Sequence, residues 1–335
     1  MSENKINWER VQGYLDGSST RAVLKPYGLP DITNPFTSRY ADVEVLPKWD
    51  IPSEVAISVA ITGGFFMTRD NPNQPISEED IIRASRECMD AGATSLHIHV
   101  RNEQELSVVD VARFATVLEP LHDEYDDLYI SAGEVAIGKD DWDEMKKVTG
   151  SGLVTGSPVN TTATFVGDTL FAKPPAVMIE KTRILQDSGV KPEIAIYTDA
   201  DVDNADRYLI KSGLLEKPYF WVVLPALPGG SPMHNPDQMV LGLKRIVDSI
   251  RDIDPESIIS VCAAGRPSTY LATLAMIMGL HVRVGMEDTV WRFPHRDELI
   301  GSNLEHLEAV RDIASLLGRS VMSGSRYREL LGVSS

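Results

Sequence analysis

From Glu54 onward the chain alternates short apolar runs, rich in β-branched residues, with amphipathic segments long enough to form helices. Strands that alternate with helices build a parallel sheet, because each helix carries the chain back to the start of the next strand. The apolar runs predict eight strands, at residues 54–61, 94–100, 127–132, 152–156, 193–197, 220–226, 257–263 and 281–285. Eight strand–helix units over roughly 260 residues predict an α/β fold of the (β/α)8 TIM-barrel type. A doubly wound open sheet is the alternative.

The segments between these runs carry helix signals. Ser77, followed three residues later by Asp80, predicts a helix start, and Gly92 predicts the end of that helix. The segment at residues 303–318, after the last strand, places apolar side chains on one helical face: Leu304, Leu307, Val310, Ile313 and Leu317. Helices of this kind cover the outside of a parallel barrel.

The N-terminal stretch follows a different pattern. Residues 1–53 lack clean periodicity and contain five prolines: Pro26, Pro30, Pro35, Pro47 and Pro52. We therefore expect residues 1–53 to be an extension and not an independent domain. Residues 54–335 are expected to form the catalytic barrel.

Composition and charge limit the partners. The formal net charge of −17 argues against nucleic acid, because phosphate binding needs clustered Lys and Arg. The longest apolar runs are strand-length, about five to eight residues, so no membrane span is expected. Cys88 and Cys262 are far apart and lie in apolar contexts, which suits reduced core thiols. We expect a cytoplasmic protein.

An anionic ligand would need a local basic site to overcome the negative charge of the chain. Four residues close together in the C-terminal part could supply one: Arg283, Arg292, His295 and Arg296. Solvated surface charges are the alternative for Arg292 and Arg296.

His97 and His99 lie two residues apart at the C-terminal end of the second predicted strand. Their side chains therefore point to the same side of the sheet, at the end where barrel enzymes place their active sites. Two imidazoles and a third ligand, commonly a carboxylate, form a catalytic metal site. Two histidines satisfied by buried hydrogen bonds remain the alternative.

Glu287 and Asp288 follow the eighth predicted strand, which brings them to the same rim of the barrel as the two histidines. Capping of the next helix is the other interpretation of these acids. Arg283 lies within that strand, where an unpaired charge is costly to bury, so it is expected to pair with Asp288 or with a bound anion.

Three other patterns do not form the sites that they suggest. The aspartates near residue 200 open with calcium-loop spacing, but Ile210 stands where the closing glutamate belongs, so a helix N-terminus is the better interpretation. The paired glycines 63–64 and 229–230 lack the flanking residues of nucleotide-binding fingerprints. Ser131 and Ser157 lack a GxSxG elbow, which argues against a serine hydrolase.

Several of these segments together resemble the β-keto acid cleavage enzymes, whose namesake is 3-keto-5-aminohexanoate cleavage enzyme. The resemblance spans about residues 55–333 and is carried by VAITGG, NPNQPIS, AGATSLHIHVR, PGG, GLHVRVGMED and LGRSVMSGSRYRELLG. It implies a zinc-dependent (β/α)8 barrel, usually a homotetramer. The implied reaction takes a β-keto acid and acetyl-CoA and yields acetoacetate and a new CoA thioester.

The resemblance also implies roles for residues. It makes His97, His99 and Glu287 the zinc ligands. Asp288 resembles the base that removes the α-proton, and Arg283 resembles the partner of that base. A serine after the third strand, here Ser131, resembles the residue that helps to orient the substrate.

Some positions depart from the family pattern. Phe65 stands where the aminohexanoate enzyme has an acid for the substrate ammonium, which argues against a β-amino substrate, although aromatic rings also accept quaternary ammonium groups. Thr289 replaces the asparagine that follows the GxED motif, and Glu134 ends a turn that is otherwise glycine-rich. A metal-dependent aldolase or hydrolase that acts without CoA is the alternative enzyme, and a metal-retaining protein without catalysis is the alternative outside enzymes.

Overall fold

The computed structural model describes residues 7–17, 47–134 and 139–333. The chain divides into two units, Met1–Ile51 and Pro52–Ser335. In the first unit, helix α1 spans Trp8–Gly17. Most of the predicted extension lies outside the described residues, so its role stays a prediction.

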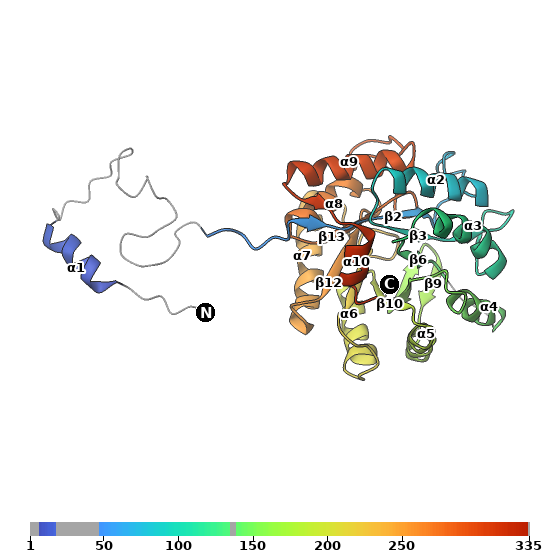
Figure 1. Cartoon of the computed structure of the whole chain (residues 1–335), viewed down its shortest axis with the longest axis horizontal. Helices are drawn as coiled ribbons and strands as arrows, with labels where there is room; N and C mark the ends of the chain where they lie inside the picture. The colour runs from blue at the N-terminus through green and yellow to red at the C-terminus, as the bar shows by residue number, and fades with distance from the viewer. Residues whose placement is uncertain (1–6, 18–46, 135–138, 334–335) are drawn as a thin grey trace. The chain divides into compact units, whose positions relative to one another are not determined.

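The second unit is built on eight parallel strands that close into a barrel (Figure 1). In chain order they are β2 Ile57–Thr62, β3 Ser95–Ile98, β6 Ile130–Ala132, β7 Gly156–Asn160, β10 Lys191–Ile196, β11 Phe220–Val223, β12 Ile258–Cys262 and β13 His281–Val284. The last strand pairs with the first, with Arg283 opposite Ser58. The predicted (β/α)8 barrel is therefore confirmed, and the open-sheet alternative is wrong.

Helices surround the strands in Figure 1. They are α2 Glu78–Asp90, α3 Val111–Glu124, α4 Lys139–Thr149, α5 Pro175–Asp187, α6 Asp199–Ala205 with the π-helical turn η2 Asp206–Ile210, α7 Pro236–Ile253, α8 Ser268–Ile277, α9 Asn303–Leu316 and α10 Gly324–Leu330. The predicted start of α2 is confirmed, because Ser77 Oγ accepts from the Asp80 amide at 3.1 Å. Thr198 caps α6, so the aspartates near residue 200 do begin a helix. Within the described residues, no helix is long and apolar enough to cross a membrane.

One predicted strand was misplaced. The fourth run, residues 152–156, precedes the true strand β7, which begins at Gly156. The strand β7 contains Pro158 and polar residues, which are unusual in a central strand. Gly156 is required because a Cβ at this position would lie 2.2 Å from the Tyr129 hydroxyl. Residues 156–160 therefore form a strand because their side chains fit the barrel interior, and not because the segment is apolar.

Helix α10 closes the N-terminal end of the barrel. Its Tyr327 is buried and contacts the rings of Tyr129, Phe220 and His281, at centroid distances of 5.2, 6.0 and 6.4 Å. Short pairs of strands complete the unit: β1 Glu54–Val55 with β14 Ser320–Val321, β4 Val100–Arg101 with β5 Ser107–Val108, and β8 Ala163–Val166 with β9 Thr169–Ala172. Because its N-terminal end is closed, the barrel presents its polar interior at the opposite, C-terminal end.

Cys88 and Cys262 are both buried free thiols, as predicted.

Candidate metal centre

Three ligand-type side chains meet at the C-terminal mouth of the barrel. His97 lies in β3, His99 follows that strand directly, and Glu287 lies in the loop after β13. The strand β2 separates β3 from β13 and ends beside Gly63. A Cβ on Gly63 would lie 2.1 Å from Cγ of Glu287, so glycine is needed here for the carboxylate to reach across β2 toward the histidines.

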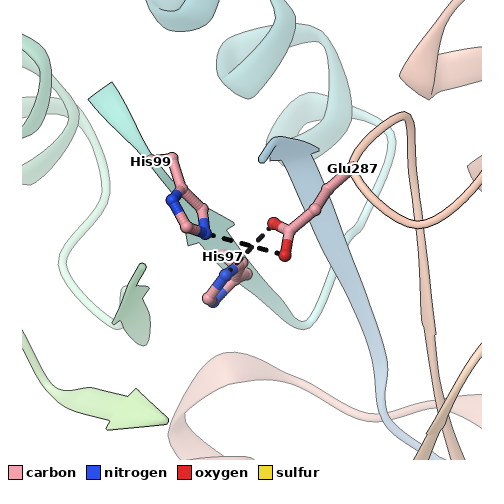
Figure 2. A group of neighbouring side chains, drawn as sticks. All are labelled: His97, His99 and Glu287. Atoms are coloured by element: carbon pink, nitrogen blue, oxygen red, sulfur yellow. Dashed lines mark ion pairs between the residues drawn. The ribbon is translucent and has the colours of Figure 1, made fainter. Parts of the chain in front are cut away.

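The three side chains point toward one another (Figure 2). Nε2 of His97 lies 3.1 Å from Oε2 of Glu287, and Nε2 of His99 lies 3.7 Å from Oε1 of Glu287. The ligand atoms of all three residues lie within 4.8 Å of one another, and all three residues are buried. The two predicted histidines and the predicted glutamate, nearly two hundred residues apart in sequence, therefore converge.

The other ring nitrogen of each histidine is held by a serine. Nδ1 of His97 lies 2.7 Å from Ser131 Oγ, and Nδ1 of His99 lies 2.8 Å from Ser107 Oγ. Ser131 in turn donates to Oε2 of Glu193 at 2.7 Å. Because its proton goes to Glu193, Ser131 accepts from Nδ1 of His97, which leaves the lone pair of that imidazole on Nε2.

This arrangement fits a metal ion. Burial lowers the pKa of His97 to about 4, against the opposing effect of Glu287, so the ring is neutral at pH 7. Burial also acts to raise the pKa of Glu287, but His97, Arg283 and His99 hold this pKa well below its usual value. Oε2 of Glu287 is buried and has no hydrogen-bond partner among the described residues.

With Nδ1 donating to Ser131, a neutral His97 presents the lone pair of Nε2 to Oε2 of Glu287 at 3.1 Å. Such a contact is unfavourable unless a cation lies between the two atoms. A tetrahedral ion with bonds of about 2.1 Å separates its ligands by about 3.4 Å. The two measured separations, 3.1 and 3.7 Å, lie on either side of that value.

Asp288 and Arg283 form a buried pair next to the three ligands. Arg283 donates from Nε to Oδ2 of Asp288 at 2.9 Å and from Nη2 to Oδ1 at 2.5 Å. Nη2 of Arg283 also lies 3.3 Å from Oε1 of Glu287. Burial raises the pKa of Asp288 to about 6 although Arg283 opposes the rise. The pairing predicted for Arg283 is present, and the carboxyl titrates nearer to neutrality than an ordinary aspartate does.

Comparison with known proteins agrees with this geometry. Residues 54–333 match the beta-keto acid cleavage enzyme family. The chain belongs to this family. It is 30% identical over 283 residues to the 3-keto-5-aminohexanoate cleavage enzyme of Acetoanaerobium sticklandii, a match that covers 84% of this chain and 99% of that protein. The protein is therefore an enzyme of the β-keto acid cleavage type.

A further relative and a solved structure are also similar to this chain. The 3-oxoadipate:acetyl-CoA acetyltransferase of Cupriavidus necator is 26% identical over 83% of this chain and 95% of its own length. A solved structure, the binary complex of ObcA with oxaloacetate, has a TM-score of 0.66 at 18% identity and covers 79% of this chain and 68% of that one. The second likeness shows the barrel fold alone.

The structure places the remaining predicted residues of the cleavage enzyme as follows. Ser131 lies behind His97, where both of its hydrogen bonds are used within the protein, and its contact with substrate stays a prediction. Phe65 packs half-buried against the residues inside the barrel. The proposed basic site is wrong as one cluster, because burial with acidic partners removes Arg283 from the exposed loop that carries Arg292 and Arg296.

Sequence reasoning missed the polar layer beneath the metal ligands. Glu193 is buried at the start of the inward face of β10 and accepts from Tyr129 at 2.8 Å as well as from Ser131. A charged residue within an apolar strand run was the available signal, because a buried carboxylate needs partners. Ser107, which holds His99, gave no signal, because its position follows from the β4–β5 pairing.

Proposed function

We propose that this protein is a zinc-dependent β-keto acid cleavage enzyme that uses acetyl-CoA. The reaction converts the β-keto acid and acetyl-CoA into acetoacetate and a new acyl-CoA. The observation that carries the proposal is the convergence of His97, His99 and Glu287, whose ligand atoms lie within 4.8 Å of one another, directly beside the Arg283–Asp288 pair. The printed name of the Cupriavidus relative supports acetyl-CoA as cosubstrate.

His97, His99 and Glu287 would hold the metal. Two imidazoles and a carboxylate suit several divalent ions, so zinc is proposed from the family resemblance. When bound, the ion supplies a Lewis acid that polarises the oxygens of the β-keto acid and makes its α-proton more acidic. Ser131 and Ser107 keep the two rings in the tautomer and orientation that this role requires.

Asp288 is proposed to move the proton. Its carboxylate takes one proton from the α-carbon, and the resulting carbanion attacks the acetyl carbonyl of acetyl-CoA and expels the CoA thiolate. The thiolate attacks the former keto carbon, and the bond between that carbon and the α-carbon breaks. The electron pair stays on the α-carbon, which recovers a proton from Asp288 to give acetoacetate. Arg283 holds the carboxyl in place throughout, so its reach to the α-carbon is fixed.

The substituent of the β-keto acid is proposed to be apolar or a quaternary ammonium. Phe65 follows β2 at the C-terminal end of the barrel and packs against the buried residues inside it. It therefore offers the substrate an aromatic surface and no negative charge. The residues of the chain therefore give no carboxylate at this position for a primary ammonium.

We also propose, from the family resemblance, a homotetramer in the cytoplasm with residues 1–53 as an extension of the barrel. Light scattering of the full chain and of a chain that begins at residue 47 tests the oligomeric state and whether it depends on the extension. A tetramer in both cases would support the proposal and would show that the barrel does not need the extension to assemble.

The decisive experiment screens purified, metal-quantified protein against β-keto acids with apolar, carboxylate and quaternary ammonium substituents. Acetoacetate and new CoA thioesters are followed by mass spectrometry with and without acetyl-CoA. Asp288→Asn should retain metal and lose about 10²–10⁴-fold in rate. His97→Ala should lose metal and activity together. Asp248→Asn, an exposed acid on α7, serves as the control and should behave like the wild type.

Acetoacetate that forms only with acetyl-CoA, and disappears in both site variants, establishes the reaction. Consumption of the keto acid without any consumption of thioester would replace the proposal with an aldolase or hydrolase. Wild-type and Asp288→Asn proteins that behave identically would indicate a protein without catalysis.

A further inference from the structure

A hollow opens at the C-terminal face of the barrel, the face that carries the metal centre. It lies among the loops that follow β11, β12 and β13 and has a cavity volume of about 450 Å³. We call it the loop groove; the lining residues used below are Met233, Met239, Arg266, Tyr270, Pro294 and His295. Its size is in the range of sites that hold extended organic ligands.

The loop groove begins next to the proposed base. The amide of Gly265 donates to the main-chain oxygen of Asp288 at 2.8 Å, and Thr289 Oγ1 donates to the main-chain oxygen of Gly265 at 2.7 Å. Arg266, the next residue, lines the groove. The loop after β12, which lines the groove, is therefore fixed to the main chain of the residues that follow Glu287.

The groove walls combine apolar side chains with stacked planar groups. The methionines and prolines give an apolar surface. The guanidinium of Arg266 lies 3.5 Å from the ring centroid of Trp291, and Tyr270 packs edge-on against His295 at 6.3 Å. Tyr270 is 46% exposed, so its ring is open to a ligand. Exposed planar groups of this kind bind nucleotide bases, whose faces stack on aromatic rings and on guanidinium planes.

The loops that form this groove carry three arginines in a strongly acidic chain. Arg266, Arg292 and Arg296 carry half-exposed or exposed guanidinium groups. Their carboxylate partners are Asp297 and Glu298, which are exposed, and Glu305, which is half-buried and pairs with Arg292; Arg266 also donates to the main-chain oxygen of Arg296 at 2.8 Å. Exposed ion pairs contribute little to stability, so a phosphate can replace the exposed carboxylates beside Arg266 and Arg296 at little cost in the stability of the fold.

We propose that the loop groove binds the 3′-phospho-ADP and pantetheine parts of a CoA thioester. The adenine stacks on the planar groups, the phosphates pair with the arginines, and the pantetheine arm crosses the apolar wall toward Asp288. This inference rests on the proposed function, since it gives the binding site for the nucleotide and pantetheine parts of a cosubstrate whose acyl group reacts at the metal centre.

The test compares two thioesters, acetyl-CoA and S-acetylpantetheine, which lacks the nucleotide. Arg266→Gln and Tyr270→Leu should each raise the KM for acetyl-CoA about tenfold, the effect of losing one charge-assisted or stacking contact, with little change in kcat. Neither variant should change the KM for S-acetylpantetheine. Tyr270→Phe keeps the stacking ring and should therefore raise the KM for acetyl-CoA much less than Tyr270→Leu does. Arg245→Gln, an exposed arginine on α7, is the matched control.

An equal loss with both thioesters, or no loss with either, overturns the inference. A change of oligomeric mass in Arg266→Gln, seen by light scattering, also overturns it, because the groove would then be a subunit contact.

Calorimetric titration with CoA itself separates this inference from the proposed reaction, since it needs no turnover. Wild-type protein that binds CoA, together with Arg266→Gln protein that binds it about tenfold more weakly, supports the groove even if no acetoacetate is formed. Wild-type protein that does not bind CoA overturns the inference.

Discussion

Arg283 holds both carboxylate oxygens of Asp288 in a buried, two-bond pair at 2.9 and 2.5 Å. The pair forms because the chain turns sharply after β13: Gly285 has φ +128°, and a Cβ there would lie 2.2 Å from the main-chain oxygen of Ala60. The turn brings Asp288 back over the strand that carries Arg283. Two parallel hydrogen bonds fix the plane of the carboxyl as well as its position.

Arg283→Lys should therefore impair activity while it retains the charge. A lysine makes a point contact, so one buried oxygen of Asp288 loses its partner, at a cost of about 1–3 kcal/mol in the free energy of unfolding. We expect kcat/KM to fall about 100-fold, because a misplaced base loses much of its effect. Steady-state kinetics and denaturant unfolding measure the two effects.

Arg319→Lys is the matched control for that variant. Arg319 is also buried, but it donates to main-chain oxygens of Pro52, Glu54, Met276 and Leu280, away from the metal ligands. It should lose stability and keep kcat/KM. If both variants lose activity in proportion to stability, the special role of the Arg283–Asp288 pair is wrong.

Two adjacent glycines provide a test of the metal centre. A Cβ on Gly63 would lie 2.1 Å from Cγ of Glu287, whereas a Cβ on Gly64 would meet nothing closer than 3.7 Å. Gly63→Ala should push Glu287 away from the histidines and weaken zinc binding by at least about tenfold, whereas Gly64→Ala should bind zinc like the wild type. Competition with a chromogenic chelator measures both affinities. Equal affinities in the two variants would argue against Glu287 as a ligand.

The barrel, and the meeting of His97, His99 and Glu287 at its mouth, could be predicted because both follow from the order and spacing of the strands. Alternation of strands and helices sets the fold, and the two-residue spacing of His97 and His99 puts both rings on one side of β3. Once a barrel is assumed, the residues after β13 must reach the same rim. Topology therefore brought Glu287 and Asp288 to the rim, and the family resemblance selected Glu287 as the metal ligand.

The rest depended on which side chains face one another across the barrel, which local spacing does not contain. Glu193 meets Ser131 because β10 pairs with β7 and β7 pairs with β6, with Ser131 opposite Gly156. The start of β7 could not be found from apolarity for the same reason: Gly156 is needed because of the bulk of Tyr129, which lies just before β6.

The link from Glu193 through Ser131 to His97 predicts a loss of metal affinity in Glu193→Gln. The amide has one acceptor oxygen for two hydroxyl donors and adds N–H groups of its own, so Ser131 no longer has a fixed acceptor. His97 then loses its fixed tautomer, and zinc affinity should fall about 10–100-fold. Glu134→Gln is the control, because Glu134 is equally buried but bonds to Ser157. Chelator competition that shows equal affinities for the two variants would contradict this link.

A final prediction concerns His281, which lies at the N-terminal end of β13. Its Nδ1 accepts from the Ala56 amide at 3.0 Å, and its ring faces Arg319 and Tyr327. Burial, with a smaller effect of Arg319, lowers the pKa of His281 to about 4. The folded protein therefore favours the neutral ring, whereas the unfolded chain binds a proton near pH 6.5.

The stability that His281 contributes is complete above about pH 6.5 and is lost as the pH falls toward about 4, to a total of about 3 kcal/mol. His281→Asn keeps an acceptor for the Ala56 amide and cannot be protonated in this range. Denaturant unfolding at constant ionic strength should show the wild type losing up to about 3 kcal/mol more than the variant between pH 6.5 and 4. Carboxylates and His306 titrate in both proteins and cancel in the difference, so parallel pH curves would show that His281 is not the group responsible.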